Sequence, residues 1–426
     1  MFFNVLKGED AYRASKSLGE KSFLWATNGE PHMIRRREIL AKYGEQVRKL
    51  YGADVRTAIQ VIAVVLSQFV IARHVRDWSW LAILPLSYVL SGTLNQNLFC
   101  AQHEISHCLA FKKPIYNHYL ALFANMVLVV PMAVKFRVRH LVFRAGNRDL
   151  LMETDKIDLI THVFYLNILQ EYHHDHHLFL GVDGGDVDLP TVLESTYVRG
   201  LFMKICYGLV YLITYGVRPL IVRPKAAHMG DVINWILVMG TNAAILYFWG
   251  IKSLFYLFAG SILGGGIHPL AGHLISEHYQ FVPGQETYSY YGPLNALGYN
   301  VGYHNEHHDF PQIPQTRLHK LREIAPEYYT NMYSHSSWCW VLYKFLTVPS
   351  LGPWSRMHRL TREGTKEGNE KFISGNCQFG TNMVDDDAGS DAGSTSEQVS
   401  SSPGRPIHRK DDSAFELKSS DTKKKL

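Results

Sequence analysis

The sequence predicts an all-α integral membrane fold with four transmembrane helices arranged as two hairpins. Two observations predict it. The central part of the chain holds four charge-free apolar runs that pair across short polar links, and histidines gather in three clusters that flank those pairs. A helix that crosses a bilayer needs about 20 apolar residues, and somewhat shorter helices are tolerated. We therefore divide the chain into a cytosolic N-terminal region, 1–56, a membrane domain, 57–363, and a disordered C-terminal tail, 364–426.

The composition narrows the class of protein. Of the 426 residues, 46% are hydrophobic, which is ordinary for a soluble protein, but polar ends dilute a very apolar middle. The five cysteines lie far apart without a CxxC pair, so the sequence indicates neither a disulfide framework nor a thiolate zinc site. The 22 histidines are clustered rather than scattered, which indicates metal binding.

The N-terminal region carries many charges and no apolar run long enough for a secretory signal. Basic residues, among them Arg35, Arg36, Arg37 and Arg56, precede the first apolar run. Because cytosolic segments next to membrane helices are enriched in Lys and Arg, we expect the N-terminus to stay in the cytosol.

Two pairs of apolar runs form the predicted hairpins. The four runs are Thr57–Ala72, Trp80–Ala101, Val232–Ile251 and Ser253–Gly272. The polar link Arg73–Asp77 joins the first two, and the last two turn at Lys252. Since each hairpin returns the chain to the side from which it started, both termini are expected on the cytosolic side.

Two further apolar runs, Ile115–Val134 and Ile205–Val217, are interpreted as helices that lie along the membrane interface. Pro114 and Pro131 near the ends of the first run favour a broken, surface-lying helix. The second run has 13 residues, which is too short for an ordinary span. The alternative is a six-span transporter or receptor, in which the histidine clusters would be separated by the membrane.

Three histidine clusters repeat one spacing. They are His103–His107, His173–His177 and His304–His308, which we call box one, box two and box three. Residues at i, i+3 and i+4 share one face of a helix, so each box presents two or three imidazoles to a common point. The resulting eight candidate ligands are His103, His107, His173, His176, His177, His304, His307 and His308.

The boxes predict a cytosolic cap that binds two metal ions. Imidazole suits iron, copper and zinc alike, so ligand type does not choose among them. A single HxxxH pattern is as consistent with a polar surface patch as with a metal site. Three boxes beside membrane helices would be costly without a function, which favours the metal site.

A ninth ligand is expected where the last hairpin returns to the surface. We favour His278 over His273, because the sequence Glu277-His278-Tyr279 resembles a ligand-bearing segment of membrane alkane hydroxylases. His273 and nearby acids are expected to orient imidazoles, although the acids could equally be surface charges. These acids are Glu104, Asp175, Glu277, Glu306 and Asp309.

Longer motifs resemble one family. They are Arg35–Tyr43, Ala101–His107, Leu180–Thr191, Glu286–Asn295 and Asn300–Pro311. Together they resemble the sphingolipid delta-4 desaturases, or dihydroceramide desaturases, of the membrane fatty-acid-desaturase superfamily, from about residue 25 to about residue 360. The chain departs from the family pattern at 138–170, about thirty residues that family members usually lack before box two and that are interpreted as an insertion.

The resemblance implies an oxidoreductase that converts dihydroceramide to ceramide. It implies two iron ions, dioxygen as co-substrate, and electrons from NADH through cytochrome b5 and its reductase. No catalytic group is expected beyond the metal ligands. A clamp on the lipid headgroup would set which carbons react. Its expected members are Asp183, Tyr288, Tyr290 and Asn295, and Asp186 and Asp188 are further candidates for a clamp or supporting role. For the loop that contains Asp183, turn chemistry is an equally good interpretation.

Two other functions stay open at this point. One is a sphingolipid C4-hydroxylase or a bifunctional desaturase/hydroxylase, and the other is a non-catalytic membrane lipid-binding homologue. The C-terminal sequence Lys423-Lys424-Lys425-Leu426 resembles the dilysine signal that retrieves membrane proteins to the endoplasmic reticulum. We therefore expect a multi-pass protein of that membrane, although a merely basic tail would read the same.

Overall fold

Helices make up almost all of the secondary structure in the computed structural model, which describes residues 23–26, 29–131, 168–225, 229–282, 285–359 and 362. These residues all belong to one unit, Met1–Cys377. The expected insertion, 138–170, falls outside them except for its last three residues. The expected tail, 364–426, with its terminal lysines, falls wholly outside them.

Two helices in this part of the chain are long and apolar enough to cross a membrane. They are α3, Val55–Val75, and α12, Met229–Trp249, the first members of the two predicted hairpins. Helix α3 begins where the Asp54 side chain accepts a hydrogen bond of 3.0 Å from the backbone N–H of Arg56. The predicted membrane helices are thus present at these two places.

The return leg of the first hairpin is continuous but irregular. It consists of α4, Trp80–Leu86, the π-helical turn η2, Ser87–Ser91, and α5, Gly92–Ser106. Pro85 precedes the π-helical turn, and a proline has no N–H for the helical ladder, so an irregularity is expected there. The leg runs five residues past its predicted end at Ala101, which carries box one into the helix.

The second hairpin turns earlier than the sequence predicted. Gly250 has a φ of +87°, a conformation that favours glycine, and it separates α12 from α13, Ile251–Gly264. Helix α13 ends at Gly264, eight residues before its predicted end at Gly272. It stops there because Gly264 is the first of three consecutive glycines, 264–266, and Pro269 follows them. Its 14 residues make it shorter than an ordinary span.

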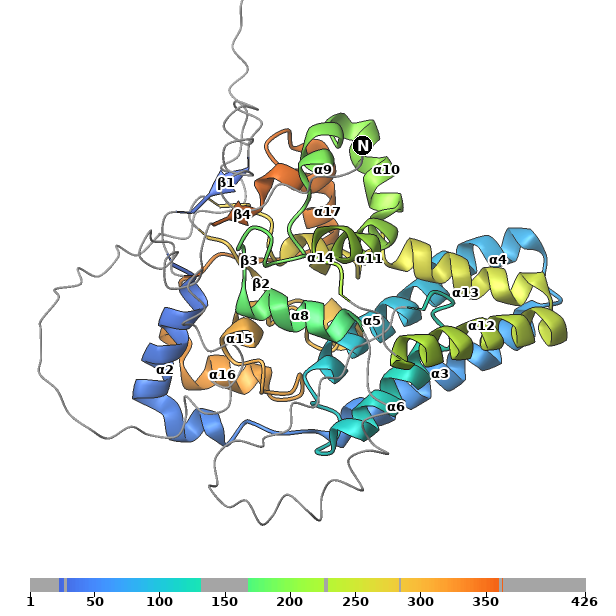
Figure 1. Cartoon of the computed structure of the whole chain (residues 1–426), viewed down its shortest axis with the longest axis horizontal. Helices are drawn as coiled ribbons and strands as arrows, with labels where there is room; N and C mark the ends of the chain where they lie inside the picture. Colours follow the sequence, from blue (N-terminus) through green and yellow to red (C-terminus); the bar gives the residue numbers. More distant parts are fainter. Residues whose placement is uncertain are drawn as a thin grey trace, which may run out of the picture. The chain divides into compact units, whose positions relative to one another are not determined.

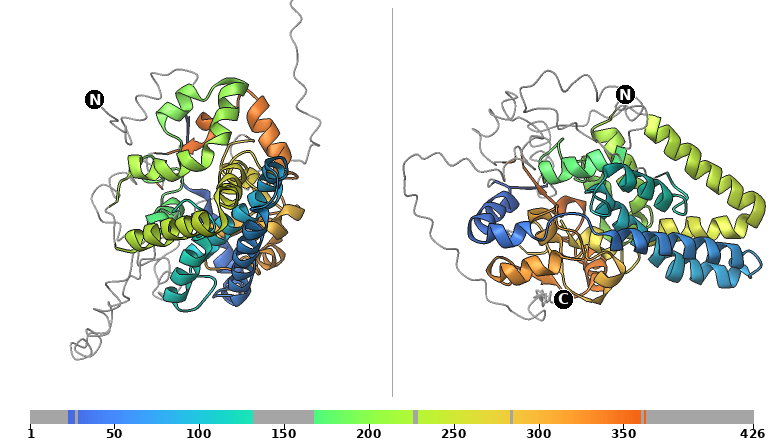
Figure 2. Two further views of the ribbon diagram at one scale, coloured as in Figure 1. Left: turned by 90° about the vertical axis from the view of Figure 1, so that its right-hand side faces the viewer. Right: turned by 90° about the horizontal axis from the view of Figure 1, so that it is seen from below.

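The two hairpins lie side by side and turn at the same end, as both views in Figure 2 show. At the turns, the Nζ of Lys252 donates to the backbone oxygen of Trp78 at 2.6 Å, and the ring of Trp80 packs edge-on to that of Phe255. Helix α13 approaches the start of α5 so closely that a Cβ at Gly264 would lie 2.5 Å from the oxygen of Gly92. Small residues allow such contacts between membrane helices.

Buried polar side chains join the helices inside this bundle. Gln68 on α3 donates to Asn95 on α5 at 2.5 Å and accepts a hydrogen bond from Tyr256 on α13 at 3.0 Å. Asn95 in turn donates to Ser261 on α13 at 2.8 Å. Because buried polar groups need partners, this network fixes the register of the three helices.

The runs predicted to lie along the interface form short or bent helices. Helix α6, Pro114–Asn125, has 12 residues and starts at Pro114. Helices α10, Gly200–Leu209, and α11, Tyr211–Val222, meet at an angle of 78°. Together they would be long enough for a third span, but a straight crossing is incompatible with this bend.

The remaining elements surround the histidine boxes (Figure 1). Helix α2, Pro31–Arg48, packs against α15 and α16 through a core that includes Ile39 and Phe310. The other helices are α8, Ile168–Leu178; α9, Val192–Tyr197; α14, Gly272–Ser276; α15, His304–Asp309; α16, Leu318–Ile324; α17, Trp338–Thr347; and the 3-10 turns η4, Pro293–Leu297, η5, Pro326–Tyr328, and η6, Pro353–Ser355. Two parallel strand pairs complete the list: β1, Leu24–Trp25, with β4, Met357–His358, and β2, Ser289–Tyr290, with β3, Ser334–His335.

Candidate metal centre

Four segments that are distant in sequence carry the predicted ligands. Box one lies at the end of α5, box two lies on α8, and box three begins α15. His278 follows the short helix α14. Helical spacing directs the imidazoles of each box to one side of its helix, so the boxes can share a centre.

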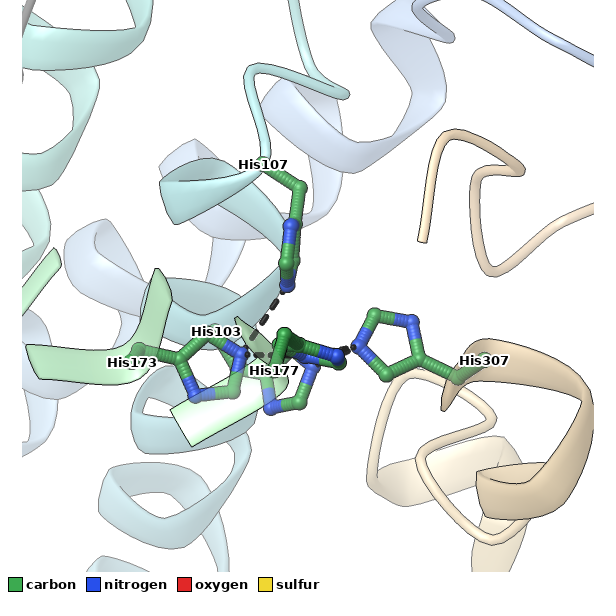
Figure 3. A group of neighbouring side chains, drawn as sticks. All are labelled: His103, His107, His173, His177 and His307. Atoms are coloured by element: carbon green, nitrogen blue, oxygen red, sulfur yellow. Dashed lines mark hydrogen bonds between the residues drawn. The ribbon is translucent and has the colours of Figure 1, made fainter. Parts of the chain in front are cut away.

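Five imidazoles form a first group, in which one ring nitrogen of each lies within 4.8 Å of the others. They are His103, His107, His173, His177 and His307. The Nε2 atoms of His103 and His307 are 2.7 Å apart, and those of His107 and His173 are 2.9 Å apart. The Nε2 of His177 lies 3.1 Å from those of His173 and His307. Figure 3 shows these rings pointing toward one another.

The remaining four predicted ligands form a second group. The Nε2 of His278 lies 3.0 Å from that of His176 and 2.9 Å from that of His304. The ring of His308 completes the group, with its centroid 4.4 Å from that of His304. The two groups adjoin, because the rings of His177 and His308 are 4.2 Å apart.

The donor chemistry of both groups fits metal ions. A neutral imidazole has one donor and one acceptor nitrogen, so rings that converge through the same atom cannot all satisfy each other by hydrogen bonds. The Nε2 of His308 is buried without a hydrogen-bond partner in the described part of the chain. Burial, reinforced by neighbouring imidazoles, lowers the pKa of His173, His177, His307 and His308 well below the usual value. Neutral imidazole is the form that binds metal.

Asp186 supports one of these rings from behind. Its Oδ1 lies 2.9 Å from the Nδ1 of His176, and Asp188 lies slightly farther away at 3.6 Å. Burial opposes ionisation of Asp186, but the neighbouring His176 outweighs it and lowers the pKa of that carboxyl to about 2. A carboxylate in this position holds the imidazole with its Nε2 directed at a metal.

Glu277 lies between two histidines, only one of which belongs to the cluster. Its Oε1 is 2.7 Å from the Nδ1 of His273 and 3.7 Å from the Nδ1 of His304. The other ring nitrogen of His273 accepts a hydrogen bond from Gln96 at 2.8 Å, so both nitrogens of this ring are engaged outside the cluster. Of the two candidates for a ninth ligand, the structure brings His278 to the other imidazoles.

Three of the predicted supporting acids have other partners. Glu104 accepts a hydrogen bond from the backbone N–H of Gln315. Asp175 pairs with Arg223 and Lys225, and Glu306 accepts hydrogen bonds from Ser289 and Tyr291. These contacts fix the segments around the boxes rather than the ring nitrogens.

The four predicted substrate contacts brace loops. The hydroxyl of Tyr288 closes the turn before β2 by hydrogen bonds to backbone groups of Phe281 and Gln285. The ring of Tyr290 stacks on that of Trp338, and Asn295 donates to the backbone oxygen of Tyr290. The backbone N–H of Asp183 donates to the oxygen of Arg359, and its carboxylate lies 3.7 Å from the Nδ1 of His358.

The N-terminal helix α2 also reaches the centre, which the sequence did not predict. The Nδ1 of His32 lies 2.7 Å from Asp309, the residue after box three, and the Nε of Arg35 donates to the same carboxylate at 2.6 Å. The ring of His32 is 5.0 Å from that of His308. The hydrogen-bonding ability of His32 and Arg35 is evident in the sequence, but no local pattern relates them to a carboxylate 277 and 274 residues away.

Two protein families match this chain. Residues 166–340 match the fatty acid desaturase model, and residues 19–56 match the model of sphingolipid Delta4-desaturase. The second match covers α2, the helix that contacts Asp309. A search of the solved structures found no match.

Curated relatives resemble the chain along nearly their whole length. A rice (Oryza sativa subsp. japonica) protein named sphingolipid delta(4)-desaturase DES1-like is 44% identical, over 82% of this chain and 95% of its own. A bovine (Bos taurus) sphingolipid delta(4)-desaturase DES1 is 39% identical, over 80% and 96%. A human (Homo sapiens) protein named sphingolipid delta(4)-desaturase/C4-monooxygenase DES2 is 39% identical, over 81% and 97%. The chain therefore belongs to the sphingolipid delta(4)-desaturase family of the fatty acid desaturases.

Proposed function

We propose that the protein is a sphingolipid delta-4 desaturase, which removes two hydrogens from dihydroceramide to give ceramide. One observation carries the proposal: two adjoining groups of buried and partly buried imidazoles meet in a chain whose relatives are named sphingolipid delta(4)-desaturase. An unactivated C–H bond requires a stronger oxidant than any side chain, so the site must hold a redox metal.

In this proposal the two groups of imidazoles hold two iron ions. One ion is held by His103, His107, His173, His177 and His307, and the other by His176, His278, His304 and His308. Iron with dioxygen as co-substrate supplies the oxidising power. The protein fixes the ring nitrogens, and burial lowers the pKa of eight of the nine proposed ligands, which favours their neutral form. At His176 burial is outweighed by the neighbouring Asp186 and Asp188, which raise the pKa.

Carboxylates orient the rings. Asp186 accepts the Nδ1–H of His176, which leaves the Nε2 lone pair of that ring directed into the second group. Glu277 and Asp309 are the other supporting acids that lie beside histidines, at His273 and His32. His273 thus takes a supporting role in this proposal, and His278 takes the role of ligand.

We further propose four membrane crossings, by α3, by α4 to α5, by α12 and by α13. The adjacent turns at Trp78 and Lys252 support this arrangement, because both hairpins then extend in the same direction. The boxes support it too, since imidazoles can meet on one face only if an even number of crossings separates them. Residues 265 and 266 after α13 are buried in protein, where non-helical backbone is tolerated at membrane depth.

The location and the electron donors follow from the proposed reaction. The histidine cap and both termini lie in the cytosol, α6, α10 and α11 lie along the interface, and the membrane is that of the endoplasmic reticulum. Electrons come from NADH through cytochrome b5 and its reductase. Two of these electrons, together with the two hydrogens of the substrate and two protons, reduce one dioxygen to two waters.

Hydroxylation at the fourth carbon is the second candidate function. The human relative whose name includes C4-monooxygenase favours it, at 39% identity over 348 residues. Both reactions start by removing one hydrogen from the same stretch of the lipid chain. They differ in whether a second hydrogen or an added oxygen follows.

The test is expression in a host that makes dihydroceramide but neither ceramide nor phytoceramide, followed by mass spectrometry of the sphingoid bases. We expect a delta-4 base from the wild-type chain and none from the variant His307→Ala. The matched control His74→Ala changes an exposed histidine at the far end of α3 and keeps the product.

Other outcomes would contradict the proposal. Phytoceramide without ceramide would assign the hydroxylase function. Neither product, from protein that reaches the membrane and is supplied with cytochrome b5 and its reductase, would favour the non-catalytic alternative. Wild-type product from the variant His307→Ala would remove this residue from the set of ligands.

A further inference from the structure

A pocket of about 720 Å³ is lined in part by the segment that leads into box three. It lies between the start of α3, the middle of α5 and the segment 291–303, and its lining includes Gln60, Asn97, Asn295 and Tyr299. Pockets for small ligands commonly measure about 300–1,000 Å³. The size is therefore appropriate for part of a lipid.

Two polar atoms at this pocket are buried without a partner. The side chain of Tyr299 is only 5% exposed, and its hydroxyl makes no hydrogen bond to any described residue. The Oδ1 of Asn97 is also buried and makes no hydrogen bond to any described residue. The amide nitrogen of Asn97 donates to the backbone oxygen of Leu297. A buried polar atom that lacks a hydrogen bond is costly, so each of these two atoms would gain a partner from a ligand that reached it.

The backbone at Tyr299 is held in an unusual conformation. Tyr299 and Asn300 have φ values of +52° and +51°, in the left-handed region that side chains other than glycine seldom adopt. Such residues persist where the surrounding structure enforces them, often at binding sites. Here the Nδ2 of Asn300 donates to the backbone oxygen of Gln315, which also lines the pocket.

The pocket is directly linked to the candidate ligands. Asn97 lies on α5 six residues before His103, a rise of about 9 Å along the helix. Tyr303 lines the pocket and precedes His304. The backbone N–H of Gln315 donates to Glu104, the neighbour of His103, at 3.0 Å. A molecule held here would have its next few atoms close to the cluster.

The chemistry of the lining favours an uncharged headgroup. Amides and hydroxyls supply most of the polar groups, and Arg56 is the single charged side chain among the lining residues. Arg56 already pairs with Asp54, because its Nε donates to both carboxylate oxygens of Asp54 at 3.0 Å. On α3 the lining continues with Ala63 and Val64, which belong to the membrane helix.

We propose that this pocket binds the amide-and-hydroxyl headgroup of a ceramide-type lipid, with the Tyr299 hydroxyl and the Asn97 Oδ1 as its hydrogen-bonding groups. The proposal rests on the proposed function and adds to it the residues that select the substrate. Neither residue is a metal ligand. Asn97 is positioned by its hydrogen bond to Leu297, and the ring of Tyr299 belongs to the hydrophobic core; neither contact involves an imidazole.

The first experiment separates binding from catalysis. Membranes that contain the full chain are labelled with a photoactivatable dihydroceramide, and turnover of dihydroceramide is measured in parallel. Tyr299→Phe should raise KM and the half-labelling concentration about fivefold, the effect of losing one uncharged hydrogen bond. The value of kcat and the iron content should stay unchanged. Tyr343→Phe, the same change at a half-exposed ring on α17, is the control and should alter nothing.

A second pair of variants tests the space rather than the hydrogen bond. Ala296 lines the pocket and is exposed, so Ala296→Trp should fill it and reduce labelling at least tenfold while iron stays bound. Leu297→Trp adds the same ring at the next residue, outside the lining, and should leave labelling unchanged. Excess unlabelled dihydroceramide should compete with the probe, and a phosphatidylcholine or a fatty acyl-CoA should not.

The outcomes distinguish this proposal from the proposed function. Wild-type KM and labelling in both Tyr299→Phe and Ala296→Trp would overturn the pocket assignment while leaving the desaturase function intact. Loss of iron from Tyr299→Phe would overturn it too, because the residue would then be structural. Competition by the phospholipid or the acyl-CoA would overturn the headgroup class. A wild-type chain that neither converts nor binds dihydroceramide would instead sink the proposed function.

Discussion

The most informative single substitution in the proposed centre is Asp186→Asn. The buried carboxylate of Asp186 lies 2.9 Å from the Nδ1 of His176 and accepts hydrogen bonds of 2.9 Å from the backbone N–H groups of Gly181 and Asp188. An asparagine has the same size but carries one acceptor oxygen and one NH₂ group. The NH₂ group of the asparagine therefore lies against at least one of these N–H donors, where no hydrogen bond can form. The substitution also removes the negative charge beside His176.

The expected effect is a loss of iron from the second group and of activity with it. Replacing the partner of a ligating histidine typically costs 10–100-fold in metal affinity or activity, which corresponds to about 1.4–2.8 kcal/mol. The carboxylate is buried and accepts hydrogen bonds from His176 and from two backbone N–H groups, so we expect the upper part of this range. The assay is iron per chain by mass spectrometry, together with dihydroceramide turnover, across a titration with an iron chelator.

A control comes from the same loop. Asp183→Asn makes the same change three residues earlier, where the carboxylate lies 3.7 Å from His358, outside the two groups of imidazoles. The chelator concentration that removes half of the iron should be the same for Asp183→Asn as for the wild type. If Asp186→Asn also retained iron and turnover at wild-type chelator concentrations, the assignment of His176 as a supported ligand would be wrong.

Three further predictions concern the fold and the ions. Gly264→Leu should lower the free energy of unfolding in detergent by about 1–3 kcal/mol, because its Cβ would lie 2.5 Å from the Gly92 oxygen. The control Gly240→Leu should not lower it, because nothing lies within 4 Å of a Cβ there. Equal melting temperatures of the two variants would contradict the helix packing. Arg35→Met should lower the free energy of unfolding by about 3 kcal/mol, because it removes a partner of the buried Asp309. The control Lys49→Met breaks an exposed ion pair and should lower it by less than about 1 kcal/mol. Chemical unfolding measures both variants, and similar losses would contradict the docking of α2. Removing iron with a chelator should lower the melting temperature of the wild type, since an ion that binds only the folded state stabilises it; an unchanged melting temperature would contradict bound iron.

Much of the fold follows from residues that act locally. The apolar runs around α3 and α12 predicted helices at the right places, because about 20 apolar residues without charge have few other stable arrangements in a bilayer. The end of α13 was missed by eight residues. Its composition stays apolar beyond Gly264, but three consecutive glycines and Pro269 favour other backbone conformations, and hydropathy does not register them.

The histidine groups show what spacing can and cannot predict. The i, i+3, i+4 pattern indicated which imidazoles share a face, and the structure brings all nine predicted ligands together. The pattern could not divide them, because His176 and His177 are neighbours on α8 and yet belong to different groups. That division depends on how α8 sits between α15 and His278, which only the tertiary structure determines.

The supporting residues were the hardest to predict. Acids next to the boxes, such as Glu104 and Glu306, hold neighbouring segments. Asp186, nine residues after box two, lies beside His176, whereas the sequence offered it only as one of several clamp or support candidates in its loop. Tyr299 carried no signal in the sequence, because it lies between the motifs Glu286–Asn295 and Asn300–Pro311 and belongs to neither. Its importance rests on a positive φ and an unpartnered hydroxyl, two properties that depend on the folded chain.

If two groups of imidazoles hold two oxidising iron ions, the metal content of the purified full-length protein should show both ions. We expect about two irons per chain in the wild type and about one in His304→Ala, which alters only the group of four histidines. A wild-type chain with clearly less than two irons, or with zinc in their place, would contradict this assignment.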